Sequence, residues 1–211
     1  MNIIFLGAPG AGKGTQADKL AAKLNIPTIS TGAIIREAIK NGTDMGAKAA
    51  VYIERGALVP DDVVIGIVKD RLAEPDCKNG WILDGFPRTV SQAIALKEMG
   101  VHVDHIISLE ISDQEIVERM SGRRVCPACA ATFHVTGNPS KAGDKCDRCG
   151  AELVIRKDDD PAVVLSRLEV YHAQSEPIKE YYGDAVIKIN VSDCSPDENF
   201  GKTVKALGLK A

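Results

Sequence analysis

The chain is poor in several features that mark large classes of proteins. Its 211 residues contain no apolar run near 18 residues, so the sequence predicts no transmembrane helix and no membrane partner. It has no basic excess: 29 acidic and 26 basic side chains leave a formal net charge of −3, which argues against a general nucleic-acid binder. The first residues lack the basic segment of a signal peptide, and we therefore expect a cytoplasmic protein.

The strongest pattern in the chain is a glycine-rich turn near its N-terminus. Strand-forming residues over Asn2–Leu6 are followed by GAPGAGKGT and then by a helix-compatible segment over Lys13–Leu24. Glycines let backbone N–H groups converge on anionic oxygens, the helix N-terminus adds partial positive charge, and Lys13 adds a mobile full charge. This order predicts a phosphate-binding loop, although Gly14 stands where the general pattern has Ser or Thr, and Thr15 follows it.

Strand and helix patterns alternate along the chain. This alternation predicts an α/β fold, with a mainly parallel five-stranded sheet and helices on both faces. The expected strands are Asn2–Leu6, Pro27–Ser30, Trp81–Asp84, His105–Glu110 and Ala185–Val191. The expected helices are Lys13–Leu24, Gly32–Lys40, Asp44–Glu54, Asp61–Ala73, Val90–Met99, Asp113–Ser121, Pro161–Tyr182 and Pro196–Leu207. Residues 30–60 and 122–159 break the rhythm, and we expect both to be insertions over the sheet edge where ligands bind.

A group of four cysteines predicts a metal site. CPAC over residues 126–129 and CDRC over residues 146–149 are separated by 16 residues. Two such pairs match a closed tetrahedral site, for which zinc is preferred and iron uses the same ligands; disulfides or free thiols are the alternative. The site would be structural, in a segment too small to bury its own core. That segment is also basic, which favours a clamp on polyphosphate. The expected ligands are Cys126, Cys129, Cys146 and Cys149.

A third pattern, DGFPRTVSQ over residues 84–92, follows directly after the expected strand Trp81–Asp84. A carboxylate at a strand end near a phosphate loop suits magnesium, bound directly or through water. Arg88 and Gln92 lie four residues apart and therefore on one helical face. Arg88 can pair with a phosphate group, and Gln92 offers the paired donor and acceptor that suit the edge of a purine base.

Several motifs, in order along the chain, resemble those of the adenylate kinase family. They are GAPGAGKGT (7–15), STGAIIR (30–36), LVP (58–60), DGFPRTVSQ (84–92), SGRRVC (121–126) and RKDDD (156–160). The cysteine-bearing segment resembles the zinc-binding lid of the long-form bacterial enzymes. The resemblance covers essentially the whole chain. It implies reversible transfer of the terminal phosphoryl group from MgATP to AMP, giving two ADP.

The resemblance also implies the P-loop nucleoside monophosphate kinase fold with two mobile insertions. The core domain would comprise residues 1–29, 61–121 and 160–211, with an AMP-binding insertion over 30–60 and a zinc-binding lid over 122–159. The implied cofactors are Mg²⁺ with ATP and a structural Zn²⁺ in the lid. The implied partners are the small molecules ATP, AMP and ADP. We expect a monomer that binds neither nucleic acid nor membrane.

Carried over residue by residue, the resemblance implies three groups of site residues. The ATP-binding residues would be Gly10, Ala11, Gly12, Lys13, Gly14, Thr15, Arg119, Thr132, Phe133 and Ser195. The AMP-binding residues would be Thr31, Arg36, Ala57, Leu58, Val59, Gly85, Arg88, Gln92, Arg156 and Arg167. The catalytic residues would be Lys13, Asp84, Arg88, Arg123, Arg156, Asp158, Asp159 and Arg167. One position departs from the family pattern, because Ala33 stands where an aspartate that organises magnesium-bound water is common.

Other function classes remain open at this stage. A kinase that uses GTP as the donor for AMP would share Arg88 and Gln92, whereas a pyrimidine monophosphate kinase would usually not have glutamine at position 92. A regulatory GTPase is disfavoured, because the sequence has no Asn-Lys-x-Asp motif. The net acidity and the single tryptophan oppose a zinc-ribbon nucleic-acid module, and the full set of cations opposes a noncatalytic nucleotide sensor.

Overall fold

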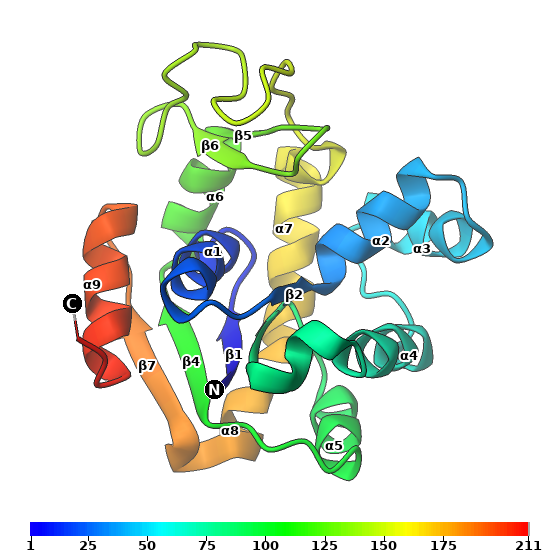
Figure 1. Cartoon of the computed structure of the whole chain (residues 1–211). Coiled ribbons are helices and arrows are strands. Elements are labelled where there is room, and N and C mark those ends of the chain that lie inside the picture. Colours follow the sequence, from blue (N-terminus) through cyan, green and yellow to red (C-terminus); the bar gives the residue numbers. More distant parts are fainter. Residues whose placement is uncertain (211) are drawn as a thin grey trace.

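A parallel sheet of five strands forms the centre of the structure, a computed structural model that describes residues 1–210 (Figure 1). The strand order is β2-β3-β1-β4-β7, and each neighbouring pair is parallel. The sheet confirms the predicted α/β class, and its strands differ from the predicted ones by no more than one residue at either end. Their bounds are β1 Asn2–Gly7, β2 Thr28–Ser30, β3 Trp81–Asp84, β4 His105–Glu110 and β7 Val186–Asn190.

Helices cover both faces of this sheet. Alternate residues of β1 point to opposite faces, so that Ile3 and Phe5 pack with α1 and α9 while Ile4 and Leu6 pack with α4, α5 and α8. No helix within residues 1–210 is long and apolar enough to cross a membrane. The helices are α1 Lys13–Leu24, α2 Thr31–Lys40, α3 Asp44–Glu54, α4 Asp61–Leu72, α5 Val90–Glu98, α6 Asp113–Ser121, α7 Pro161–Val170, α8 Ile178–Tyr182 and α9 Pro196–Ala206.

The two stretches that break the α/β rhythm both project from the core, residues 122–159 at the top of the view and α2 and α3 at its right (Figure 1). Residues 30–60 form α2 and α3. Residues 122–159 contain a small antiparallel sheet of β5 (Arg123–Val125) and β6 (Thr132–His134), which the sequence pattern did not predict. The two stretches touch, because the ammonium group of Lys40 on α2 donates to the carbonyl of Pro127 at 3.2 Å.

The prediction of one continuous helix over Pro161–Tyr182 is wrong. Helix α7 ends at Val170 and continues as a π-helical turn over Tyr171–Ser175, where the backbone N–H of Glu176 donates to the carbonyl of Tyr171 at 2.8 Å. Pro177 then interrupts the backbone hydrogen bonding, because proline has no N–H, and α8 begins at Ile178. A π-helical turn contains more residues than an α-helical turn, so the side chains after Ser175 point in other directions than they would in a continuous α-helix.

A tight crossing of α2 and α3 requires glycine at position 46. A Cβ atom at Gly46 would lie 2.3 Å from the carbonyl carbon and oxygen of Ala38. We therefore expect Gly46→Ala to lower the free energy of unfolding by about 1–3 kcal/mol through overpacking. Gly66→Ala on α4 is the matched control, since a Cβ there meets no atom within 4 Å among the described residues, and it should stabilise by about 0.5–1 kcal/mol. Urea titration of both variants tests this, and equal effects would contradict it.

Candidate functional site

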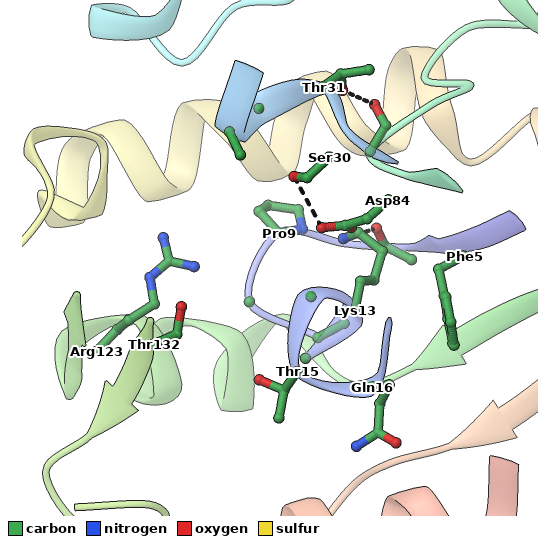
Figure 2. A pocket seen from close by; sticks show the side chains of 18 of the residues that line it. Phe5, Pro9, Lys13, Thr15, Gln16, Ser30, Thr31, Asp84, Arg123 and Thr132 are labelled. Atoms are coloured by element: carbon green, nitrogen blue, oxygen red, sulfur yellow. Dashed lines mark hydrogen bonds between the residues drawn. The ribbon is translucent and has the colours of Figure 1, made fainter. Parts of the chain in front are cut away.

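The glycine-rich loop joins β1 to α1 in the way that phosphate binding requires. Gly10 and Gly12 adopt φ angles of 85° and 97°, which residues with a Cβ rarely adopt. Lys13 is the first residue of α1, and its ammonium group curls back to donate to the carbonyls of Gly7 at 2.7 Å and Ala8 at 2.8 Å. The cation is thus held directly over the loop (Figure 2).

The environment of Lys13 favours the binding of an anion. Burial lowers the pKa of Lys13 to about 8, against the opposing effect of Asp84 and with smaller contributions from Arg88, Arg167 and Arg123. A polyphosphate placed between these cations would reverse that effect, since an opposite charge favours the protonated amine. The loop and its lysine therefore form an anion site that is electrostatically incomplete without a ligand.

A cleft of about 800 Å³ runs from this loop to both insertions. Arg123 and Thr132 of the small sheet face the same cavity as Lys13 (Figure 2). Predicted cations from distant parts of the chain come together here. Those that line the cleft are Lys13, Arg36, Arg88, Arg119, Arg123, Arg156 and Arg167.

Two buried aspartates hold these arginines in place. Arg167 Nη1 lies 2.9 Å from Asp158 Oδ2, and Arg123 Nε donates to Asp159 Oδ2 at 2.7 Å. Burial opposes ionisation of Asp158, but Arg167 and the other arginines outweigh it and lower the pKa of that carboxyl. Asp158 lines the cleft, whereas the Asp159 side chain is 0% exposed and is not among the lining residues. The aspartates therefore orient cations that would otherwise repel one another.

Hydrogen bonds connect several of the residues expected to bind AMP. Gly85 joins two of them, because its carbonyl accepts from Thr31 Oγ1 at 2.8 Å and from Arg88 Nε at 2.8 Å. Burial and then the charge of Arg167 lower the pKa of Arg88. All of the expected residues line the cleft: Thr31, Arg36, Ala57, Leu58, Val59, Gly85, Arg88, Gln92, Arg156 and Arg167.

Most residues expected to bind ATP also line the cleft, but Ser195 does not. Ser195 is the N-cap of α9, where its backbone N–H donates to Glu198 Oε2 at 2.7 Å and its hydroxyl accepts from the Glu198 N–H. Its backbone groups are therefore engaged in a capping box, a motif that S-x-x-E in the sequence indicates. The expected residues that do line the cleft are Gly10, Ala11, Gly12, Lys13, Gly14, Thr15, Arg119, Thr132 and Phe133.

Asp84 stands at the end of β3, directly beside the loop. Its Oδ2 atom accepts from the Ser30 hydroxyl at 3.3 Å and lies next to Gly14. A carboxylate and a hydroxyl near a phosphate loop provide the oxygen ligands that hydrated Mg²⁺ prefers. Ala33 also lines the cleft, but it offers no such ligand.

Sequence reasoning missed several residues that hold the site together. The Ser175 hydroxyl donates to the carbonyl of Arg88 at 2.8 Å, and Asp61 accepts from Gln92 at 2.7 Å. Gln16, Arg148 and Asn199 line the cleft without having been predicted. Asp61 had a signal only as a helix-initiating acid, and Ser175 had none, because the π-helical turn that orients it was not predictable from periodicity.

The four paired cysteines form a compact cluster in the 122–159 segment. Their sulfur atoms all lie within 4.8 Å of one another, with separations of 3.4 Å for Cys126–Cys149 and 3.5 Å for Cys129–Cys146. Tetrahedral zinc with Zn–S bonds of about 2.3 Å requires sulfur separations of about 3.8 Å, so the cluster fits that ion. The four cysteines are free, so the disulfide alternative is wrong. The cluster shares a small core with Ala131 and Phe133.

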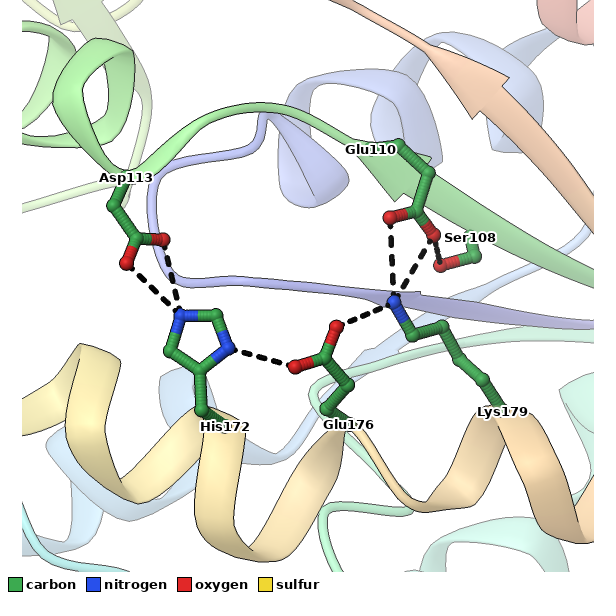
Figure 3. Close-up of polar contacts among 6 residues, drawn as sticks. All are labelled: Ser108, Glu110, Asp113, His172, Glu176 and Lys179. Atoms are coloured by element: carbon green, nitrogen blue, oxygen red, sulfur yellow. Dashed lines mark hydrogen bonds and ion pairs between the residues drawn. The ribbon is translucent and has the colours of Figure 1, made fainter.

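A chain of ion pairs joins α6 to the π-helical turn and includes Lys179, which lines the cleft (Figure 3). His172 Nδ1 lies 2.7 Å from Glu176 Oε2, and His172 Nε2 lies 3.0 Å from Asp113 Oδ2. Lys179 continues the chain from Glu176 at 2.9 Å to Glu110 at 3.3 Å. The network ties the start of the helix that carries Arg119 to the segment that carries Ser175.

This network predicts a pH-dependent stability. The hydrogen bond to Glu176 raises the pKa of His172 against the smaller, opposing effect of burial, and the hydrogen bond to Asp113 raises it further. When the pKa of a histidine is higher in the folded protein than in the unfolded chain, its protonation stabilises the fold. This stabilisation is complete below the unfolded-state pKa of about 6.5, and it is lost as the pH rises through the folded-state pKa. For this half-exposed group, we expect His172→Gln to cost about 0.5–1 kcal/mol at pH 5.5 and much less at pH 9. Thermal melts of both proteins across that range test this, and a pH-independent difference would contradict it.

Comparison with known proteins agrees with this geometry. The family model described as adenylate kinase matches residues 5–187. An adenylate kinase of Agathobacter rectalis is 52% identical over 213 residues, covering 99% of this chain and 100% of the relative. Adenylate kinases of Caldicellulosiruptor saccharolyticus and Acetivibrio thermocellus are 49% and 52% identical, over 100% and 86% of this chain and the same shares of the relatives. The cleft, the sheet and these matches together show that the chain belongs to the adenylate kinase family and is a nucleoside monophosphate kinase.

Proposed function

We propose that this adenylate kinase moves the γ-phosphoryl group of MgATP onto AMP within the cleft described above. The observation that carries the proposal is the convergence of Lys13, Arg88, Arg123, Arg156 and Arg167 on one cavity beside the phosphate loop. Two highly charged nucleotides repel each other, and a cage of fixed cations removes that barrier. Phosphoryl transfer needs such positioning and charge neutralisation more than covalent help.

The residues that line the cleft are proposed to form two sites, one for the phosphoryl donor ATP and one for the acceptor AMP. Gly10–Thr15 would hold the ATP phosphates through backbone N–H groups, and Arg119, Thr132 and Phe133 would contact the donor nucleoside. Thr31, Arg36 and the Ala57–Val59 segment would hold AMP, together with Gly85, Arg88 and Gln92. Arg156 and Arg167, which also line the cleft, would contact the phosphates of both nucleotides. Ser195 would contribute by starting α9 beside the donor site.

No general base is required for the reaction. The phosphate of AMP is already an anion at neutral pH and attacks as such. The ammonium group of Lys13 would move with the transferring group. It would give up its hydrogen bonds to the carbonyls of Gly7 and Ala8 and donate to the phosphate oxygens instead. Asp158 and Asp159 would keep Arg123 and Arg167 aimed at the same group. Mg²⁺, when bound with ATP, supplies charge neutralisation on the phosphate oxygens, and Asp84 would hold it directly or through water.

The three parts of the chain have separate proposed roles. The core (residues 1–29, 61–121 and 160–211) carries the phosphate loop, residues 30–60 carry AMP, and residues 122–159 close over ATP. Closure of both insertions would exclude water, which would otherwise hydrolyse ATP. Contacts between them support this, since Lys157 lies 3.9 Å from Glu54 in addition to the Lys40–Pro127 contact.

The cysteine cluster is proposed to bind a structural Zn²⁺ that stabilises the lid and takes no part in the chemistry. A shell of four thiolates leaves no open position for substrate or water. We further propose that the protein acts as a cytoplasmic monomer whose partners are ATP, AMP and ADP, with neither nucleic acid nor membrane among them.

The test is a transfer assay with the pure protein. MgATP is mixed with AMP, GMP, CMP or UMP in turn, and nucleoside diphosphate formation is followed. We expect rapid transfer from MgATP when AMP is the acceptor, and no rapid transfer with the other three monophosphates. Equal transfer to a pyrimidine monophosphate would contradict the assignment of Gln92, and no transfer to any of the four would overturn the proposal.

A further inference from the structure

The side chain of Gln92 is held at both ends by neighbouring residues. Its Oε1 atom accepts from the backbone N–H of Arg88 at 2.7 Å. Its Nε2 atom donates to Oδ1 of Asp61, the first residue of α4, at 2.7 Å. The other oxygen of Asp61 accepts from the Thr89 hydroxyl at 2.8 Å, which fixes the carboxylate in turn. Gln92 is 1% exposed and lines the cleft, where it is proposed to contact AMP.

These partners determine which way the Gln92 amide faces. An ionised carboxylate can only accept hydrogen bonds, and a backbone N–H can only donate. Rotating the amide by half a turn would place its NH₂ against the N–H of Arg88 and its oxygen against Asp61. Both contacts would then be repulsive, at a side chain that is only 1% exposed. Asp61 and Arg88 therefore leave one orientation.

A fixed amide presents a fixed pattern to a base. Oε1 has a second lone pair and Nε2 has a second hydrogen, so Gln92 retains one acceptor and one donor. The edge of adenine matches this pair, because its N6 amino group donates and its N1 atom accepts. The same edge of hypoxanthine or guanine carries O6, which accepts, and N1–H, which donates. Those bases would need the reversed amide.

We propose that Asp61 is a positioning residue that makes the AMP site select adenine over 6-oxopurines, by fixing the orientation of the Gln92 amide. The inference rests on the proposed function, in which the base of AMP lies against Gln92. Asp61 would act only through Gln92, without touching the nucleotide. Because Gln92 is buried, water cannot compensate a base that presents the wrong edge, and this strengthens the discrimination.

The test compares AMP with IMP, which has the same ring system and the reversed hydrogen-bonding edge. Asp61→Asn keeps the size of the side chain but replaces an acceptor-only group with an amide that can pair with either end of Gln92, so that only the N–H of Arg88 still disfavours the reversed amide. We expect the ratio of kcat/KM for AMP to that for IMP to fall about tenfold, with the KM for MgATP unchanged. Asp62→Asn removes the same charge from the same helical turn at an exposed position, and should leave the ratio unchanged.

A double-mutant cycle separates positioning from a purely structural role. In a Gln92→Ala background, Asp61→Asn should have no further effect on the AMP/IMP ratio, whereas a general loss of stability would act in both backgrounds. An unchanged ratio in Asp61→Asn would overturn the inference. So would tighter binding of AMP by that variant, since it would mean that Asp61 withholds Gln92 from the base. Failure of the wild-type protein to phosphorylate AMP would instead overturn the proposed function, and this inference with it.

Discussion

Replacement of Lys13 by methionine should lower kcat by about 1000-fold, the largest effect that we expect from any single substitution. Methionine keeps the length of the side chain and removes the charge. Lys13 is the cation nearest the phosphate loop, and its ammonium group is held by the carbonyls of Gly7 and Ala8. Loss of one preorganised charge that stabilises the transferring group costs about 4 kcal/mol in activation free energy, which corresponds to this factor.

The control for this substitution lies on the same helix. Lys23→Met removes a charge from the exposed last turn of α1 and should leave kcat within twofold of the wild type. Steady-state assays with saturating MgATP and AMP give the comparison, and thermal melts establish that both variants are folded. A Lys13→Met protein with more than a third of the wild-type kcat would show that the phosphate loop acts without its lysine.

Loss of the metal from the lid should produce the largest change in stability. We expect Cys146→Ser, at a buried position of the cluster, to abolish stoichiometric zinc binding and to lower Tm by about 10 °C. The hydrophobic cluster around the cysteines has four buried members, Cys126, Ala131, Phe133 and Cys146, too few to hold the segment without a metal. For a chain of this size, 10 °C corresponds to about 3 kcal/mol.

Cys77→Ser is the matched control for the zinc prediction. Cys77 is buried but lies outside the cluster, so its replacement should retain the metal and cost about 1 kcal/mol or less. Metal content by atomic absorption and Tm by calorimetry are measured on the same samples. If Cys146→Ser loses its zinc and its Tm is unchanged, the metal does not stabilise the fold. If turnover falls at once on chelation while Tm stays constant, the structural role is wrong.

Local patterns were sufficient for most of the fold. The predicted bounds of Lys13–Leu24, Asp44–Glu54 and Trp81–Asp84 agree with the structure, because each segment has a clear period and a turn signal at its ends. The prediction of one helix over Pro161–Tyr182 is wrong, because nothing in the sequence signals the π-helical turn at Tyr171–Ser175 and the prediction did not take into account the interruption of backbone hydrogen bonding at Pro177. The β5–β6 pair was not predicted, because strands of three residues are too short to show an alternating pattern in the sequence.

The site was predictable where chemistry shows in the residue types. The glycine-rich loop with its lysine, the paired cysteines and DGFPR each indicate a binding site from one short stretch of sequence. Contacts between residues that are far apart in the sequence have no such local signal. That Asp61 would hold Gln92, or that Ser175 would hold the carbonyl of Arg88, depends on how α4, α5 and the π-helical turn pack together. Ser195 is a different case, because S-x-x-E indicates a helix cap from the sequence alone, and the structure shows that cap at the start of α9.

The most direct test of the account is the fate of the γ-phosphoryl group in a closed reaction, followed by ³¹P NMR. The account holds that two nucleotides are brought together in a cleft that excludes water. With MgATP and AMP, it predicts two ADP for each AMP consumed, no inorganic phosphate, and no turnover of ATP when AMP is omitted. Steady release of inorganic phosphate from ATP alone, at a rate comparable with transfer, would contradict it.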